Sequence, residues 1–172
     1  MTVAPEVALF EQYKTRIGQV IGVSDWLVVT QRDADLFAAL TDDWDYMHND
    51  PAWAEPRFGG TIAHALYVMA LIPKVMKGLV EGIPIISSET ASALNYGYNN
   101  VRVIRPLLID ERFKDTVSVK DVVEKRPGDY LVTDQHTFVK EGEEAPFMVV
   151  EKLGYYTTGY QDKWQPETTV RR

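Results

Sequence analysis

The sequence predicts an α+β fold in which a curved antiparallel sheet wraps a long buried helix. Two observations lead to this prediction. Residues 62–80 are apolar on nearly all sides as far as Ile72, which is typical of a helix inside a domain. Four segments rich in β-branched and aromatic residues then follow, and turn sequences separate them as in antiparallel hairpins: 96–104, 116–125, 130–140 and 147–157.

The size and composition of the chain fit one globular domain. With 172 residues, of which 45% are hydrophobic, the chain is long enough to bury a core. We predict a single domain over residues 1–160 and a loose polar tail over residues 161–172. The net charge of -7 does not fit a nucleic-acid-binding surface, and the absence of cysteine excludes disulfides and thiolate chemistry.

The hydrophobic runs of the chain do not predict a membrane protein. The longest run, near the middle of the chain, is too short to span a bilayer. The N-terminal residues carry scattered charges and lack the continuous apolar core of a signal peptide. We therefore expect a cytoplasmic protein without a membrane partner.

In chain order, the first predicted element is a helix over residues 7–17, where apolar residues recur at roughly helical spacing. Gly18 and Gly22 interrupt this pattern, and a β-branched and aromatic segment over residues 26–30 predicts a strand. A short amphipathic helix over residues 33–40 follows and leads directly into an aspartate-rich segment.

That segment, TDDWDYMHND at residues 41–50, is predicted to be a structured loop, because aspartate favours turns and helix starts. Asp50 and Pro51 can open a short helix as its cap and first residue. Thr61 is a candidate cap for the long buried helix, and Pro73 is a candidate site for a kink in it.

Asp43 and His48 are the candidate catalytic pair within this loop. They are five residues apart and can face a common space, where a carboxylate and an imidazole can move protons to and from water. The alternative is that His48 is an ordinary loop histidine and that the aspartates only form turns. A metal site is not predicted, because the segment lacks the ligand alternation, internal glycine and closing glutamate of a calcium loop.

The start of the long helix supplies a second chemical element. Backbone N–H groups in the first turn of a helix have no acceptor within the helix, so they can stabilise an oxyanion such as that of a thioester. His64 lies close to this start. From its apolar surroundings in the sequence we interpret it as a core residue.

The segment TDDWDYMHNDPAWAEPRFGGTIAHALYVMALIP, residues 41–73, resembles the signature of the MaoC-like dehydratases, also called (R)-specific or type 2 enoyl-CoA hydratases. Asp43 and His48 fall on the catalytic Asp and His of this family, at its spacing. A later segment, NYGYNNVRVIRP from Asn95, resembles the nodulation-protein-N-like branch. The resemblance covers roughly residues 18–156.

This resemblance implies a hot-dog fold, an acyl-CoA substrate, no separate cofactor and at least a homodimer. It implies that Asp43 and His48 activate one water, which adds to C3 of a trans-2-enoyl-CoA; dehydration of an (R)-3-hydroxyacyl-CoA is the reverse reaction. The backbone amide of Ala65 takes the position that holds the thioester oxygen. Further candidate substrate-binding residues are Gly60, Asn95, Asn99 and Arg102, although the last three also fit a purely structural role in a strand.

The sequence departs from the family pattern at four positions. Asp42 replaces the usual Gly before the catalytic Asp, Asp45 replaces the usual Asn or Gln two residues after it, and Tyr46 replaces the usual Pro or Trp that follows. Ala65 replaces the Gly after the second histidine. Two alternative functions therefore stay open on the same fold: an acyl-CoA thioesterase, and a non-catalytic subunit that binds acyl-CoA.

Overall fold

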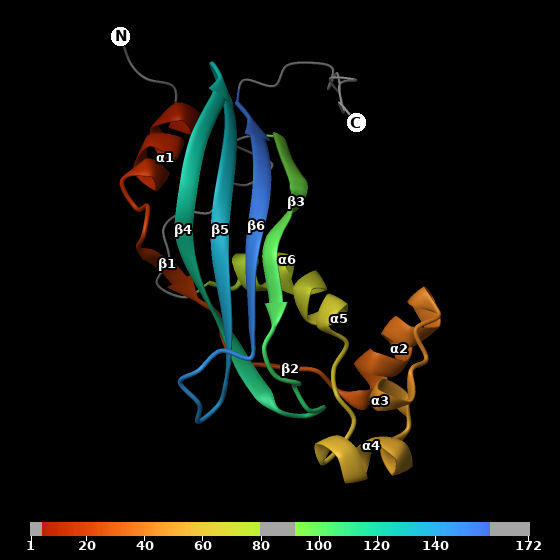
Figure 1. The fold of residues 1–172 in the computed structure, drawn as a ribbon. Helices are drawn as coiled ribbons and strands as arrows, with labels where there is room; N and C mark the ends of the chain where they lie inside the picture. Colours follow the sequence, from red (N-terminus) through yellow and green to blue (C-terminus); the bar gives the residue numbers. More distant parts are fainter. Residues whose placement is uncertain (1–4, 80–91, 159–172) are drawn as a thin grey trace.

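A computed structural model describes residues 5–79 and 92–158, which form a curved antiparallel sheet with helices along one face and at one end (Figure 1). The strand order is β1-β4-β5-β6-β3, and β2 pairs with β4. The predicted tail at 161–172 and the predicted helix end at residue 80 lie outside the described residues. Within the described ranges, no helix is long and apolar enough to cross a membrane.

The four predicted long strands are confirmed. Their β-branched and aromatic residues and the turn sequences between them locate them within a few residues of their observed ends. In β5, every second residue from Tyr130 to Phe138 is buried, and these include Asp134 and His136. The bounds are β3 Ser92–Val103, β4 Arg112–Arg126, β5 Asp129–Lys140 and β6 Met148–Thr157.

The N-terminal strands differ from the prediction. The segment expected over residues 26–30 is reduced to β2, Leu27–Val28, and a further strand β1, Val20–Val23, precedes it. Sequence patterns missed β1 because Gly22 interrupts it. The structure explains this glycine: a Cβ there would lie 3.0 Å from the Cβ of Leu79, so a larger residue would force the two segments apart.

The buried face of the sheet packs against α1, Pro5–Lys14, and against the central helices in one hydrophobic core. In α1, which confirms the predicted first helix, the ring of Phe10 stacks on Tyr130 at 4.1 Å between centroids. Two ionisable residues of the sheet are also completely buried. Asp115 Oδ2 and His136 Nδ1 are 2.6 Å apart, and both side chains have 0% exposure.

The long central helix predicted from residue 62 is wrong in its start and in its continuity. Ile62 pairs with Leu108 as an isolated bridge, so the chain is still extended there, and Thr61 caps no helix. The helical segments are α5, Ala65–Ala70, and α6, Ile72–Lys77. They are separate because Pro73 has no N–H to donate to the carbonyl four residues earlier.

The central helices are also less buried than predicted. Val68, Ile72 and Val75 face the core, but Leu66 is 65% exposed in this single chain. An apolar pattern on all sides of a helix therefore overstates its burial here, since part of that apolar surface faces outward.

Between β2 and α5, three helices gather at one end of the sheet (Figure 1). The first, α2, Gln31–Thr41, confirms the predicted helix at 33–40, and α3, Tyr46–Asn49, is a single short turn. The third, α4, Pro51–Phe58, begins as predicted: Pro51 is in its first turn, and the Asp50 side chain accepts a hydrogen bond from the N–H of Trp53 at 3.1 Å.

Candidate active site

Three of the four aspartates at 41–50 have structural roles. Asp42 ends α2 in the left-handed region (φ 61°), where glycine is common and aspartate is tolerated. Asp45 begins α3 and accepts a hydrogen bond from Met47 N at 3.2 Å, as Asp50 does for α4. These helix ends account for the departures at Asp42 and Asp45 and leave Asp43 without a capping role.

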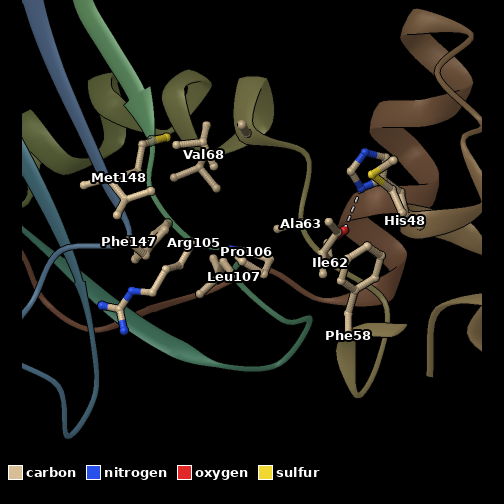
Figure 2. A pocket seen from close by; sticks show the side chains of 14 residues that line it. His48, Phe58, Ile62, Ala63, Val68, Arg105, Pro106, Leu107, Phe147 and Met148 are labelled. Carbon is tan, nitrogen blue, oxygen red and sulfur yellow. Dashed lines mark hydrogen bonds between the residues drawn. The ribbon is translucent and has the colours of Figure 1, made fainter. Parts of the chain in front are cut away.

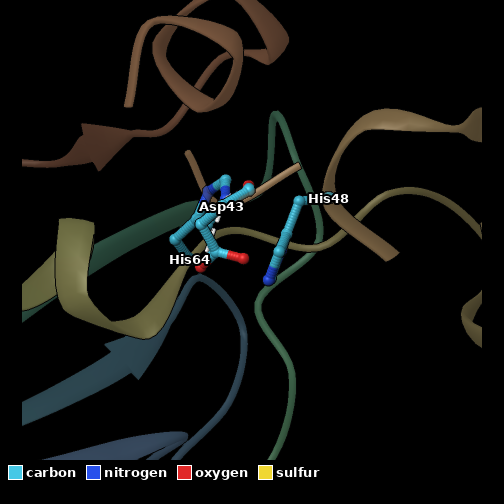
Figure 3. Close-up of side chains that lie close together, drawn as sticks. All are labelled: Asp43, His48 and His64. Carbon is cyan, nitrogen blue, oxygen red and sulfur yellow. Dashed lines mark hydrogen bonds and ion pairs between the residues drawn. The ribbon is translucent and has the colours of Figure 1, made fainter. Parts of the chain in front are cut away.

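Asp43, His48 and His64 converge at one place, as Figure 3 shows. One polar atom of each lies within 4.8 Å of the others. The rings of His48 and His64 stack with their centroids 3.8 Å apart, and His64 Nε2 is 3.9 Å from Asp43 Oδ2. The structure thus brings together the predicted pair and adds His64 to it.

Sequence reasoning did not predict that His64 lies in this cluster. The residue is buried, at 2% exposure, as the core interpretation expected, but it touches both predicted catalytic residues. The one sequence signal for this position was that residues 58–64, which precede the helix start, belong to the segment that resembles the family signature.

The hydrogen bond of the His48 ring determines which of its nitrogens can act as a base. Nδ1 lies 2.7 Å from the backbone oxygen of Ile62. Because a carbonyl only accepts, Nδ1 carries the hydrogen, and Nε2 of the neutral ring has a free lone pair. The backbone of His48 is held as well, since its carbonyl accepts a hydrogen bond from Gln31 Nε2 at 2.9 Å.

The surroundings of His48 favour its neutral form. Partial burial is the largest cause and lowers its pKa, and His64 lowers it further. The hydrogen bond to Ile62 and the charges of Asp43 and Asp45 act in the opposite direction without reversing the shift. His48 therefore remains an unprotonated base to a lower pH than an ordinary histidine.

A carboxylate and two imidazoles are also common metal ligands. The ligand atoms of the three side chains lie within 4.8 Å of one another, which is close enough to hold a metal ion. In the structure, however, the two rings stack, and His64 Nε2 donates to the backbone carbonyl of Asp43. The arrangement as it stands suits proton transfer.

An apolar pocket of about 490 Å³ adjoins this cluster (Figure 2). His48 lines one side of it, and the opposite wall comes from the start of β6 and the β3–β4 connection, with Phe147, Met148 and Leu107. The remaining lining is apolar except for Arg105, whose guanidinium is paired with Glu143 at 2.7 Å. Such a pocket fits an apolar chain with its reactive end at His48.

Ala65 lines the same pocket and is the first residue of α5. In the part of the chain that the structure describes, its backbone N–H has no hydrogen-bond acceptor. The residue with this free donor therefore lines the same pocket as His48, and its part in holding an oxyanion stays a prediction.

The other predicted binding residues lie elsewhere in this chain. Gly60 is in the turn after α4, Asn95 donates a hydrogen bond to the hydroxyl of Tyr98 at 2.8 Å, and Arg102 donates to its neighbour's carbonyl. Asn99 lies with the last two on β3 at the edge of the sheet. None of the four lines the pocket within this chain, so their substrate contacts stay predictions.

The family model of a MaoC-like domain matches residues 12–140, which is more than half of the chain. The chain belongs to the MaoC-like dehydratase family. Among its MaoC-like relatives is 3-hydroxyacyl-thioester dehydratase Z of Mycobacterium tuberculosis, which is 35% identical over 143 residues, 81% of this chain and 89% of that protein. Nodulation protein N of Rhizobium leguminosarum is 35% identical over 135 residues, 77% of this chain and 81% of that protein.

The fold of this MaoC-like protein is also that of a solved hydratase. The (R)-hydratase from A. caviae superposes with a TM-score of 0.61 over 79% of this chain and 95% of that one, at 19% identity. These findings confirm the predicted hot-dog fold and family. With the named relatives, they also confirm the prediction of a hydratase or dehydratase, an enzyme of the hydro-lyase class.

Proposed function

We propose that this protein interconverts trans-2-enoyl-CoA and (R)-3-hydroxyacyl-CoA, with Asp43 and His48 acting on one water. The observation that carries the proposal is the position of His48, whose Nε2 has its lone pair available: it lies beside the Asp43 carboxylate and also lines the apolar pocket that Ala65 lines. The name of the relative that dehydrates 3-hydroxyacyl thioesters supports the substrate class.

In the hydration direction, each group has one task. Water bound between Asp43 and His48 is oriented by the carboxylate and gives a proton to Nε2 of His48 as its oxygen attacks C3. The N–H of Ala65 stabilises the charge that develops on the thioester oxygen. The proton on His48 then passes to C2, so that one water is consumed and the base is regenerated. Dehydration runs through the same steps in reverse.

Absorbance of the enoyl thioester tests this reaction. Purified protein mixed with crotonyl-CoA should remove the absorbance band without releasing free thiol. Release of thiol would support the thioesterase alternative. If neither signal changes while the protein still binds the CoA ester, the result would favour a specialised substrate or a non-catalytic acyl-CoA-binding subunit. We expect activity to persist after treatment with a chelator, since no step uses a metal or separate cofactor.

Substitution of Ala65 by proline should remove the oxyanion donor while sparing the fold. Proline is well tolerated at the first position of a helix, and His64 already has the extended backbone that must precede it (φ -62°, ψ 124°). We expect kcat to fall by roughly 10²–10³-fold. Ala65→Gly keeps the N–H and is the control, with activity close to that of the wild type. Equal activity of both variants would rule out the amide's role.

The pH profile should follow the lowered pKa of His48. Since the base acts unprotonated, the acid limb of kcat/KM should lie below pH 6.5, the ordinary pKa of histidine. Asp45→Asn keeps the cap of α3 but removes a charge that raises this pKa, so the limb should move to still lower pH. Asp42→Asn, whose charge is not among those that shift this pKa, should leave the limb in place. An unmoved limb in Asp45→Asn would contradict the assignment of His48 as the base.

The proposal includes a homodimer and a cytoplasmic location. Support for the dimer comes from β3, which lies at the edge of the sheet and exposes Leu94, Tyr96 and Val103. An open edge strand with exposed apolar side chains is a surface that another chain can cover. Sedimentation of the intact protein should give twice the 19.5 kDa mass of the chain, and cell fractionation tests the location.

A further inference from the structure

His64 is held between two rings in the structure. Its imidazole stacks on His48 at 3.8 Å and packs against Phe37 at 5.0 Å between centroids, so its orientation is fixed from both sides. It does not line the apolar pocket, and at 2% exposure it has almost no contact with solvent. It therefore touches the catalytic residues from behind without facing the substrate.

One nitrogen of His64 binds Asp43. Nε2 lies 3.1 Å from the backbone carbonyl of Asp43, and because a carbonyl only accepts, Nε2–H is the donor. The same nitrogen lies 3.9 Å from Asp43 Oδ2. Among the described residues, this is the one polar contact of the Asp43 carboxylate, whose side chain is 47% exposed. Without His64, the described residues offer no other hydrogen bond or ion pair to the Asp43 carbonyl or carboxylate.

The other nitrogen of His64 destabilises the folded state. Nδ1 is buried and has no hydrogen-bond partner within the described ranges. A buried acceptor without a donor destabilises the folded state, whereas a phenylalanine ring in the same stack would leave no polar atom unpaired. Histidine is thus a poor choice for packing at this position, which points to a task for its Nε2–H.

From these contacts we infer that His64 is a positioning residue for the dehydratase reaction: its Nε2–H fixes Asp43 and its ring supports His48, so that both groups face the same water. This inference rests on the proposed function. Correct placement of the reacting groups is worth a large share of the rate, and a displacement of about 1 Å can cost on the order of 10²-fold.

Two variants separate the hydrogen bond from the stack. His64→Phe keeps an aromatic ring against His48 but removes the donor. His64→Gln loses the ring but places an amide N–H near the position of Nε2. We expect kcat for crotonyl-CoA to fall about 10–100-fold in His64→Phe and to stay within about tenfold of the wild type in His64→Gln. KM should change little in both, because His64 does not line the pocket.

Thermal stability distinguishes a positioning role of His64 from a purely structural one. The thermal midpoint of His64→Phe should equal or exceed that of the wild type, because the unpaired buried nitrogen is gone. Wild-type kcat in His64→Phe would overturn the inference. A kcat in His64→Gln as low as in His64→Phe would overturn the role of the donor, and a sharply lowered midpoint in His64→Phe would assign the residue to packing.

A measurement without substrate keeps this test independent of the proposed function. The backbone carbonyl carbon of Asp43 should shift upfield in the NMR spectrum of His64→Phe, where the bond is lost, and keep its position in His64→Gln. If the wild type does not act on crotonyl-CoA, the proposed reaction fails, while these shifts still decide whether His64 holds Asp43. Unchanged shifts in both variants would overturn the inference.

Discussion

Asp43→Asn and His48→Asn should each lower kcat for crotonyl-CoA by roughly 10²–10⁴-fold, the range found for loss of a general acid or base. Asparagine at position 43 keeps the size of the side chain but loses the charge that orients the water. At position 48, the asparagine amide can still donate to the Ile62 carbonyl, as Nδ1 does now, but it offers no base in place of Nε2.

Neither change should unfold the protein. The Asp43 side chain is about half exposed and caps no helix, and the replacement at His48 preserves its hydrogen bond to the backbone. Thermal unfolding measured on the same samples provides this control. The matched variant Asp42→Asn, one residue away, keeps a left-handed backbone that asparagine tolerates, and it should retain activity. Activity within tenfold of the wild type in both catalytic variants would disprove the assigned pair.

Asp115→Ala should cause the largest loss of stability, about 3–5 kcal/mol, because it breaks a fully buried pair. Asp115 Oδ2 is bonded to Nδ1 of His136, and its Oδ1 accepts the N–H of Thr137 at 2.9 Å. Alanine leaves both donors without a partner in the core. The free energy of unfolding in urea measures the effect.

A second substitution shows whether the loss comes from the unpaired group. In Asp115→Ala combined with His136→Phe, the abandoned imidazole is replaced by an apolar ring, so the double variant should be more stable than Asp115→Ala alone. A loss below about 1 kcal/mol in the single variant would show that the pair is not an important part of the core.

The sequence predicted the sheet well because its signals are local. The β-branched and aromatic residues of β5 and the Pro127-Gly128 turn before it are both local features of the sequence. The cap at Asp50 was predictable for the same reason. The central helix was predictable only in part. Pro73 signalled the interruption between α5 and α6. The late start of α5 was not predictable, because it follows from the bridge between Ile62 and Leu108, two residues far apart in the chain.

In the candidate site, too, some features follow from the local sequence and others depend on contacts between distant segments. Asp43 and His48 were predictable because spacing and family resemblance both single them out. The position of His64 between Phe37 and His48 was not, since it depends on how α2 packs beside the start of α5. Asp42 and Asp45 looked like changes to the chemistry until helix ends accounted for them. A sequence pattern shows which residue types are present but not which of them the fold uses as caps.

The two sides of the pocket come from different parts of the chain. The groups proposed to react belong to the segment from α2 to α5, whereas the pocket wall opposite His48 is built by the β3–β4 connection and by Phe147 and Met148 at the start of β6. Mutations in that wall can change which acyl chains fit without moving a proton-transfer group. Substrate preference can therefore change through one part of the chain while the groups proposed for proton transfer stay in place in another.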